Sequence, residues 1–149
     1  MQASDFFSSD DRLRIELAIR EAELNTSGEI RVHVETTFSG ELLDRAATVF
    51  ARLGMHKTAL RNGVLFYLAI NKRQFAVIGD SGINQVVPGN FWAEIRSVME
   101  DCFKNSQFAE GLSKGIIMAG EQMKKHFPHR LDDQDELPNN ISIGEDTKS

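Results

Sequence analysis

A run of seven consecutive apolar residues, 64–70, constrains the fold of this chain more than any other feature. Turn-forming residues bound the run on both sides, at 61–63 and 71–73. An apolar run of this length between turns is typical of a central strand covered on both faces, and it is far shorter than the roughly 20 residues that cross a membrane. The run therefore predicts a sheet with helices on both sides and no insertion into a membrane.

The segments around this run predict an alternation of helices and strands. Residues 30–34 alternate apolar and polar side chains, as in a strand with one covered face, and residues 74–78 form a hairpin with the central strand. Helices are expected at four places, residues 9–24, 42–53, 91–104 and 108–126. In the first of them the apolar residues at near-helical spacing are Leu13, Leu17, Ile19, Ala22 and Leu24. A right-handed crossover should make strands 30–34 and 64–70 parallel. The predicted fold class is α/β, a three-layer α/β/α sandwich with a small mixed sheet.

Charge is concentrated at the C-terminal end of the chain. The net charge is −5, and residues 127–149 carry six acids against two bases. The body is thus close to neutral and has no basic stripe, so no nucleic-acid partner is expected. We expect one domain at residues 1–128 and a partly disordered acidic tail at 129–149. In an alternative that stays open, residues 136–143 dock on the body as an extended segment.

The N-terminus and the cysteine content bear on location. Residues 1–5 lack a basic segment followed by an apolar run, so no signal peptide is expected. The single cysteine, Cys102, excludes an internal disulfide. A cytoplasmic monomer is the expectation.

Three polar, glycine-containing loops should meet at one edge of the sheet. If strands 30–34 and 64–70 are parallel, the loops before them lie at the same end, and the hairpin strand returns to it. The residues gathered there would be Ser27, Gly28, Arg61, Asn62, Gly63, Gly79, Asp80 and Gly82.

The chemistry of this edge allows two readings. Asp80 and Asn62 offer oxygen ligands for Ca²⁺ or Mg²⁺, and Arg61 can bind a phosphate oxygen. A phosphatase would use Asp80 and Arg61 as catalytic residues, with Asp80 and Asn62 as metal ligands. In the structural alternative, Asp80 caps the following turn and pairs with Arg61. A rival site lies at the carboxyl ends of the parallel strands, where α/β sheets usually bind ligands. Its residues would be Thr36, Thr37, Ser39, Asn71 and Lys72, with Asp10 and Asp11 nearby.

Residues 9–128 resemble the TPM-domain family through four segments, 26–30, 61–65, 78–83 and 108–112, in this order and spacing. The resemblance implies an α/β/α sandwich and an association with membrane-protein maintenance. It also implies acid phosphatase activity in some members and a divalent cation in one lineage. Three of the segments fall at the polar edge, which favours that edge over the rival site.

No familiar catalytic motif, such as a P-loop, GxSxG or HExxH, is present. The leading hypothesis is therefore a non-enzymatic interaction module that meets an unknown, membrane-associated protein partner. A divalent-metal-assisted phosphatase and a Ca²⁺-binding regulatory domain are the alternatives.

Overall fold

The computed structural model describes residues 1–129 and 140–144 as helices around a mixed sheet. The sheet has the strand order β3-β2-β1-β4. Strand β1 pairs in parallel with β2 and with β4, and β3 pairs antiparallel with β2. The predicted crossover and hairpin are thus confirmed. The strands are β1 (Glu29–Glu35), β2 (Gly63–Ala69), β3 (Gln74–Gly79) and β4 (Ser142–Gly144).

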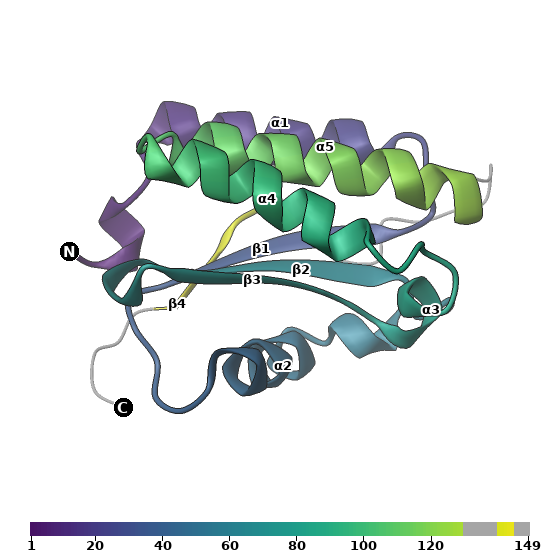
Figure 1. The fold of residues 1–149 in the computed structure, drawn as a ribbon, viewed down its shortest axis with the longest axis horizontal. Helices are drawn as coiled ribbons and strands as arrows, with labels where there is room; N and C mark the ends of the chain where they lie inside the picture. The colour runs from purple at the N-terminus through teal and green to yellow at the C-terminus, as the bar shows by residue number, and fades with distance from the viewer. Residues whose placement is uncertain (130–139, 145–149) are drawn as a thin grey trace.

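Helices cover both faces of the sheet, which confirms the predicted sandwich. Helices α1, α4 and α5 lie together on one face, and α2 lies on the other (Figure 1). The long helices are α1 (Ser9–Glu23), α2 (Leu42–Arg52), α4 (Phe91–Lys104) and α5 (Phe108–His126). The short ones are η1 (Ala3–Asp5), η2 (Met55–Lys57), η3 (Ile70–Lys72) and α3 (Ser81–Asn84). Within residues 1–129 and 140–144, every helix is too short or too polar to cross a lipid bilayer.

Strand β2 lies at the centre of the core, as its apolar run predicts. All seven of its residues are buried. Val64, Phe66 and Leu68 pack with α1, α4 and α5, whereas the alternate residues Leu65 and Tyr67 pack with α2. Because successive side chains of a strand point to opposite faces, one apolar strand holds both helical layers to the sheet.

Strand β1 differs from the expectation of one covered face, because all seven of its residues are buried. Its polar residues Arg31, His33 and Glu35 are 9%, 7% and 4% exposed. They lie on the α2 side of the sheet, opposite Ile30, Val32 and Val34 of the main core. The sequence pattern gives the two faces correctly, but it does not show that the polar face is also covered.

Strand β4 was not predicted as a strand. Ser142–Gly144 pairs with His33–Glu35, and Ile141 before it is buried among the residues of the main core. The alternative of an extended docked segment over residues 136–143 thus holds for residues 141–143. Residues 136–139, which belong to the same alternative, lie outside the described residues. The proposed domain boundary and partly disordered tail stay predictions.

Three of the apolar residues at helical spacing in α1 and its C-cap are exposed. Leu13, Leu17 and Leu24 are 54%, 50% and 71% exposed. The small residues Ala18 and Ala22 take the contact with α5 instead: a Cβ added at Gly120 of α5 would lie only 2.6 Å from the Cβ of Ala22. Because the two helices pack through small side chains, the leucines beside them remain outside the core.

Candidate functional site

The predicted polar edge forms where β1 and β2 begin. Glu29 and Gly63 are register partners at the start of the two strands, and Val64 pairs with Gly79 at the end of β3. Backbone hydrogen bonds join the loops: Asp80 N donates to Gly63 O and Gly82 N donates to Arg61 O, both at 2.9 Å. The convergence expected from strand direction is therefore present.

Arg61 and Asp80 form a bidentate ion pair at this edge. Arg61 Nε donates to Asp80 Oδ2 at 2.7 Å, and Arg61 Nη2 donates to Asp80 Oδ1 at 2.8 Å. The backbone N–H of Ser81 also donates to Asp80 Oδ1, at 2.7 Å, so Asp80 caps α3. Asp80 is buried, whereas the Arg61 side chain is 51% exposed. These are the contacts of the structural alternative, and whether the pair also has a catalytic role stays a prediction.

The donor set at this edge does not fit a divalent cation in the arrangement described. Asp80 Oδ1 accepts two hydrogen bonds and Oδ2 accepts one, and the positive charge of the Arg61 guanidinium lies against both oxygens and would repel a cation there. Asn62 is buried and its Oδ1 has no hydrogen-bond partner, but among residues 1–129 and 140–144 no cluster of three His, Cys, Asp or Glu residues could hold a metal ion. Ca²⁺ or Mg²⁺ binding by Asp80 and Asn62 stays a prediction.

Ser27 and Gly28 lie at the same edge and attach it to the end of α5. Ser27 N donates to Phe127 O at 2.8 Å. Asn62 Nδ2 lies 3.5 Å from Ser27 Oγ, a long hydrogen bond. A Cβ added at Gly28 would lie 2.1 Å from Met123 Cε of α5. These two positions serve the packing of the edge.

A hollow of about 370 Å³ opens beside the Arg61–Asp80 pair. His56 of η2 lines it together with Arg61 and Asp80, and Phe50 and Ile78 belong to its apolar wall. The sequence did not indicate His56 as part of this cluster, because it precedes Arg61 in an irregular loop. The hollow is the place where an anion could meet the exposed side of Arg61.

The residues of the rival site, at the carboxyl ends of the strands, form contacts with the N-terminal segment and with the β2–β3 hairpin. Thr36 Oγ1 accepts from Ala3 N at 3.0 Å, and Thr36 O accepts from Asn71 N at 2.9 Å. Lys72 Nζ lies 4.3 Å from the centre of the Phe38 ring. Asp10 and Asp11 lie in the first turn of α1. The contacts recorded for these residues are structural.

The sequence did not reveal a buried polar network under α2. Glu35 accepts a hydrogen bond from Arg45 Nε at 2.9 Å and further bonds from Arg45 Nη2 and from the Tyr67 hydroxyl. His33 Nε2 lies 3.6 Å from Glu35, and His33 Nδ1 lies 2.9 Å from Ser142 Oγ of β4. The network depends on strand register, which places His33 opposite Tyr67. Register is set by the tertiary structure, so the sequence alone does not bring these residues together.

The protonation equilibria of this network follow from its burial and hydrogen bonds. Burial acts to raise the pKa of Glu35, but the hydrogen bonds from Arg45 and Tyr67, the nearby His33 ring and the charge of Arg45 outweigh it and lower the pKa to about 2. Burial, with the bond to Glu35, raises the pKa of Tyr67. Glu35 is thus held ionised and Tyr67 neutral, which indicates a structural network rather than an acid–base pair.

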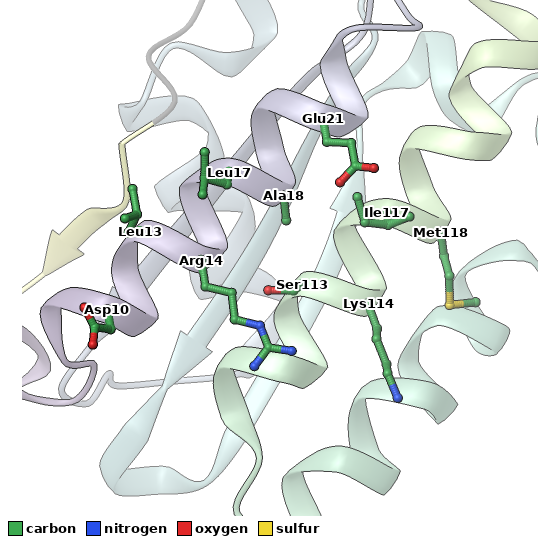
Figure 2. A pocket seen from close by; sticks show the side chains of 10 residues that line it. All are labelled: Asp10, Leu13, Arg14, Leu17, Ala18, Glu21, Ser113, Lys114, Ile117 and Met118. Carbon is green, nitrogen blue, oxygen red and sulfur yellow. The ribbon is translucent and has the colours of Figure 1, made fainter.

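A groove of about 730 Å³ runs between α1 and α5 on the outer side of the helical layer. Leu13, Leu17 and Ala18 of α1 and Ile117 and Met118 of α5 supply its apolar lining (Figure 2).

The charged residues of the groove are ordered along it. Arg14 extends from α1 toward α5, where Lys114 lies, while Asp10 and Glu21 lie near opposite ends (Figure 2). Arg14 and Lys114 are each 3.9 Å from Glu110, and both side chains are more than half exposed. The groove thus has an apolar lining, an acid at each end, and a centre where two bases share one acid, Glu110.

Comparison with known proteins identifies the family that has this fold. The TPM domain model matches residues 1–122. The NMR structure of the BA42 protein from the psychrophilic bacterium Bizionia argentinensis is 47% identical, with a TM-score of 0.89 over 94% of this chain and 97% of that one. No protein with a curated description matches the chain.

Two more distant solved structures share the fold alone. One is the N-terminal domain of a P. gingivalis protein, with 19% identity and a TM-score of 0.67 over 85% of this chain and 83% of that one. The other is the N-terminal domain of the cg2496 protein from Corynebacterium glutamicum, with 16% identity and a TM-score of 0.62 over 77% of this chain and 72% of that one. From the family model and the 47% identical structure, we conclude that the chain belongs to the TPM domain family.

Proposed function

We propose that the chain is a protein-interaction module that binds an amphipathic helix of a partner protein in the groove between α1 and α5. The observation that supports this is the exposure of Leu13 and Leu17, at 54% and 50%, beside an apolar groove. Apolar side chains gathered on a surface mark contact sites more often than single exposed leucines do. A helix bound in the groove would cover both leucines and pack against α1 and α5.

The charges of the groove specify the partner helix further. Arg14 and Lys114 share one acid, Glu110, so one positive charge remains at the centre and favours an acid on the middle of the partner. Asp10 and Glu21 favour a base near each end of the partner helix. The membrane association of the partner, its role in membrane-protein maintenance and the cytoplasmic location of the complex stay predictions from the family resemblance.

Two synthetic helical peptides of about 15 residues test this proposal. Both carry leucine at helical spacing, one has a central Glu and terminal Lys residues, and the other has these charges exchanged. In NMR titrations of the full chain, the first peptide should shift amide signals along α1 and α5. It should bind about tenfold more tightly than the second, because opposite charges then meet across the groove.

The variant Leu17→Glu should weaken binding of the first peptide about tenfold or more, because it places a charge on the apolar lining. Leu43→Glu on α2 is the matched control, since Leu43 is 55% exposed and lies outside the groove. Equal binding of both peptides, or equal loss in the two variants, would reject the proposal. A dimer that Leu17→Glu dissociates would assign the groove to a second copy of the chain and also reject it.

A phosphatase is the second candidate, and the hollow beside Arg61 favours it. The pair with Asp80 engages Arg61 Nε and Nη2, and the half-exposed guanidinium shares the hollow with His56. Arg61 could then bind a phosphate oxygen while Asp80 holds it in place. No step is assigned to a cation, because the oxygens of Asp80 are engaged.

Hydrolysis of an aryl phosphate tests this second candidate, with and without added Mg²⁺ or Ca²⁺. Turnover should fall about 10²-fold or more in Arg61→Gln and in Asp80→Asn, since each change removes or misplaces the anion-binding group. Circular dichroism would show that both variants fold. Absence of turnover in the unaltered chain under all conditions would reject both the simple and the metal-assisted phosphatase. NMR shifts on adding Ca²⁺ without turnover would support the regulatory alternative.

A further inference from the structure

A separate cavity of about 650 Å³ opens at the end of the sheet where β2 finishes and β3 begins. The β2–β3 connection, the α4–α5 connection and η1 lie at this same end (Figure 1). The cavity thus lies beyond the carboxyl end of a parallel strand, where α/β sheets commonly bind ligands, and its volume is that of an ordinary small-molecule site.

Phenylalanines from four separate segments line this cavity, namely Phe6, Phe75, Phe103 and Phe108. Their rings contact one another in sequence, with centroids 5.1 Å apart for Phe6–Phe108, 5.3 Å for Phe103–Phe108 and 4.9 Å for Phe75–Phe103. All four side chains are only partly buried, although they pack against the main core. Aromatic surface left open inside a cavity is available to an apolar ligand.

The rim of the cavity carries charged side chains, and two of its residues have left-handed backbone conformations. Arg73 and Lys104 lie on it with one acid, Glu100, and in the part of the chain that the structure describes none of the three forms an ion pair. Arg73 and Ser106, also on the rim, adopt left-handed conformations with φ of 52° and 59°. Each of these two residues ends a helical turn, Arg73 after η3 and Ser106 after α4, so tight connections form this part of the rim.

We infer that this cavity is a binding site for a small apolar molecule that carries one carboxylate. The phenylalanines would cover its apolar body, and Arg73 and Lys104 would hold the carboxylate at the rim. A single negative charge suits the rim, because two cations and one acid leave one positive charge there. The site lies apart from the α1–α5 groove and from Arg61, so it is independent of the proposed function.

Two soluble probes of equal apolar size and opposite charge test the inference, 4-phenylbutyrate and 4-phenylbutylamine. NMR titration of the full chain should show 4-phenylbutyrate shifting signals of Arg73, Phe75, Phe103 and Phe108, while the amine binds at least about tenfold more weakly. Arg73→Gln and Lys104→Gln should each weaken 4-phenylbutyrate binding several-fold to about tenfold. Lys57→Gln is the control, because Lys57 is exposed and lies outside the cavity.

The charge-reversed double variant Arg73→Glu/Lys104→Glu separates binding from folding. It should reverse the preference, so that 4-phenylbutylamine binds more tightly than 4-phenylbutyrate. A variant that merely loses structure cannot acquire a reversed preference. Equal binding of the two probes to the unaltered chain, shifts located outside the cavity, or an unchanged preference in the double variant would overturn the inference.

Discussion

Replacing Arg45 with methionine should lower the free energy of unfolding by about 3 kcal/mol at neutral pH. Arg45 donates to both oxygens of Glu35, whose side chain is only 6% exposed. Without Arg45 the Glu35 carboxylate would remain buried and would lose the two hydrogen bonds and the ion pair that Arg45 supplies. Urea unfolding followed by circular dichroism measures the change.

Arg52→Met is the matched control for this experiment. Arg52 lies on the same helix, is exposed and forms no ion pair in the part of the chain that the structure describes. Its replacement should alter the free energy of unfolding by less than about 0.5 kcal/mol. Equal losses in the two variants would show that Glu35 does not depend on Arg45.

The same ion pair gives stability a predictable dependence on pH. The pKa of Glu35 falls from an ordinary value of 4.5 in the unfolded chain to about 2 in the folded one. A lowered folded-state pKa contributes stability that is present above pH 4.5 and is lost as the pH falls toward 2. The difference in stability between the unaltered chain and Arg45→Met should therefore shrink between pH 7 and pH 3, and a constant difference would contradict the assignment.

Gly82→Ala should lower the free energy of unfolding by about 2–3 kcal/mol. A Cβ at residue 82 would lie 2.2 Å from Leu60 O and 2.6 Å from Arg61 O. Both neighbours are backbone carbonyls that cannot rotate away, and Gly82 N donates to one of them. The loop carrying Arg61 would have to move away from α3, so the variant should also disturb the NMR signals of the Arg61–Asp80 pair.

Gly89→Ala is the control for this prediction. A Cβ at residue 89 meets no atom within 4 Å, and its backbone is not in the left-handed region. The change should be neutral or slightly stabilising, because alanine restricts the unfolded chain more than glycine does. If Gly82→Ala proves as mild as Gly89→Ala, then the close approach of the two loops is not required for the fold.

The layout of the sheet followed from local sequence patterns. The apolar run of β2 required helices on both faces, and the helix between β1 and β2 required a parallel crossover. Strand direction then placed the loops of Arg61 and Asp80 together. These steps worked because period, turn residues and crossover handedness are nearly local properties of a chain.

The surfaces available for binding did not follow from those patterns. Helical spacing does not distinguish the exposed Leu13 and Leu17 from the buried residues of α1, because the small residues Ala22 and Gly120 let α5 pack beside the two leucines. Strand β4 is only three residues long, too short to give a periodic signal of its own. The phenylalanine cavity draws its walls from segments about 100 residues apart in the chain.

The sequence by itself determined the class of fold, the direction of the β1–β2–β3 strands and the meeting of the polar loops, because each depends on neighbours along the chain. Only the tertiary structure decided which apolar residues stay exposed, which charges are buried under α2, and which side chains face a cavity. Those outcomes depend on how closely distant elements approach, and that distance is set by side-chain volume at contacts that no local pattern records.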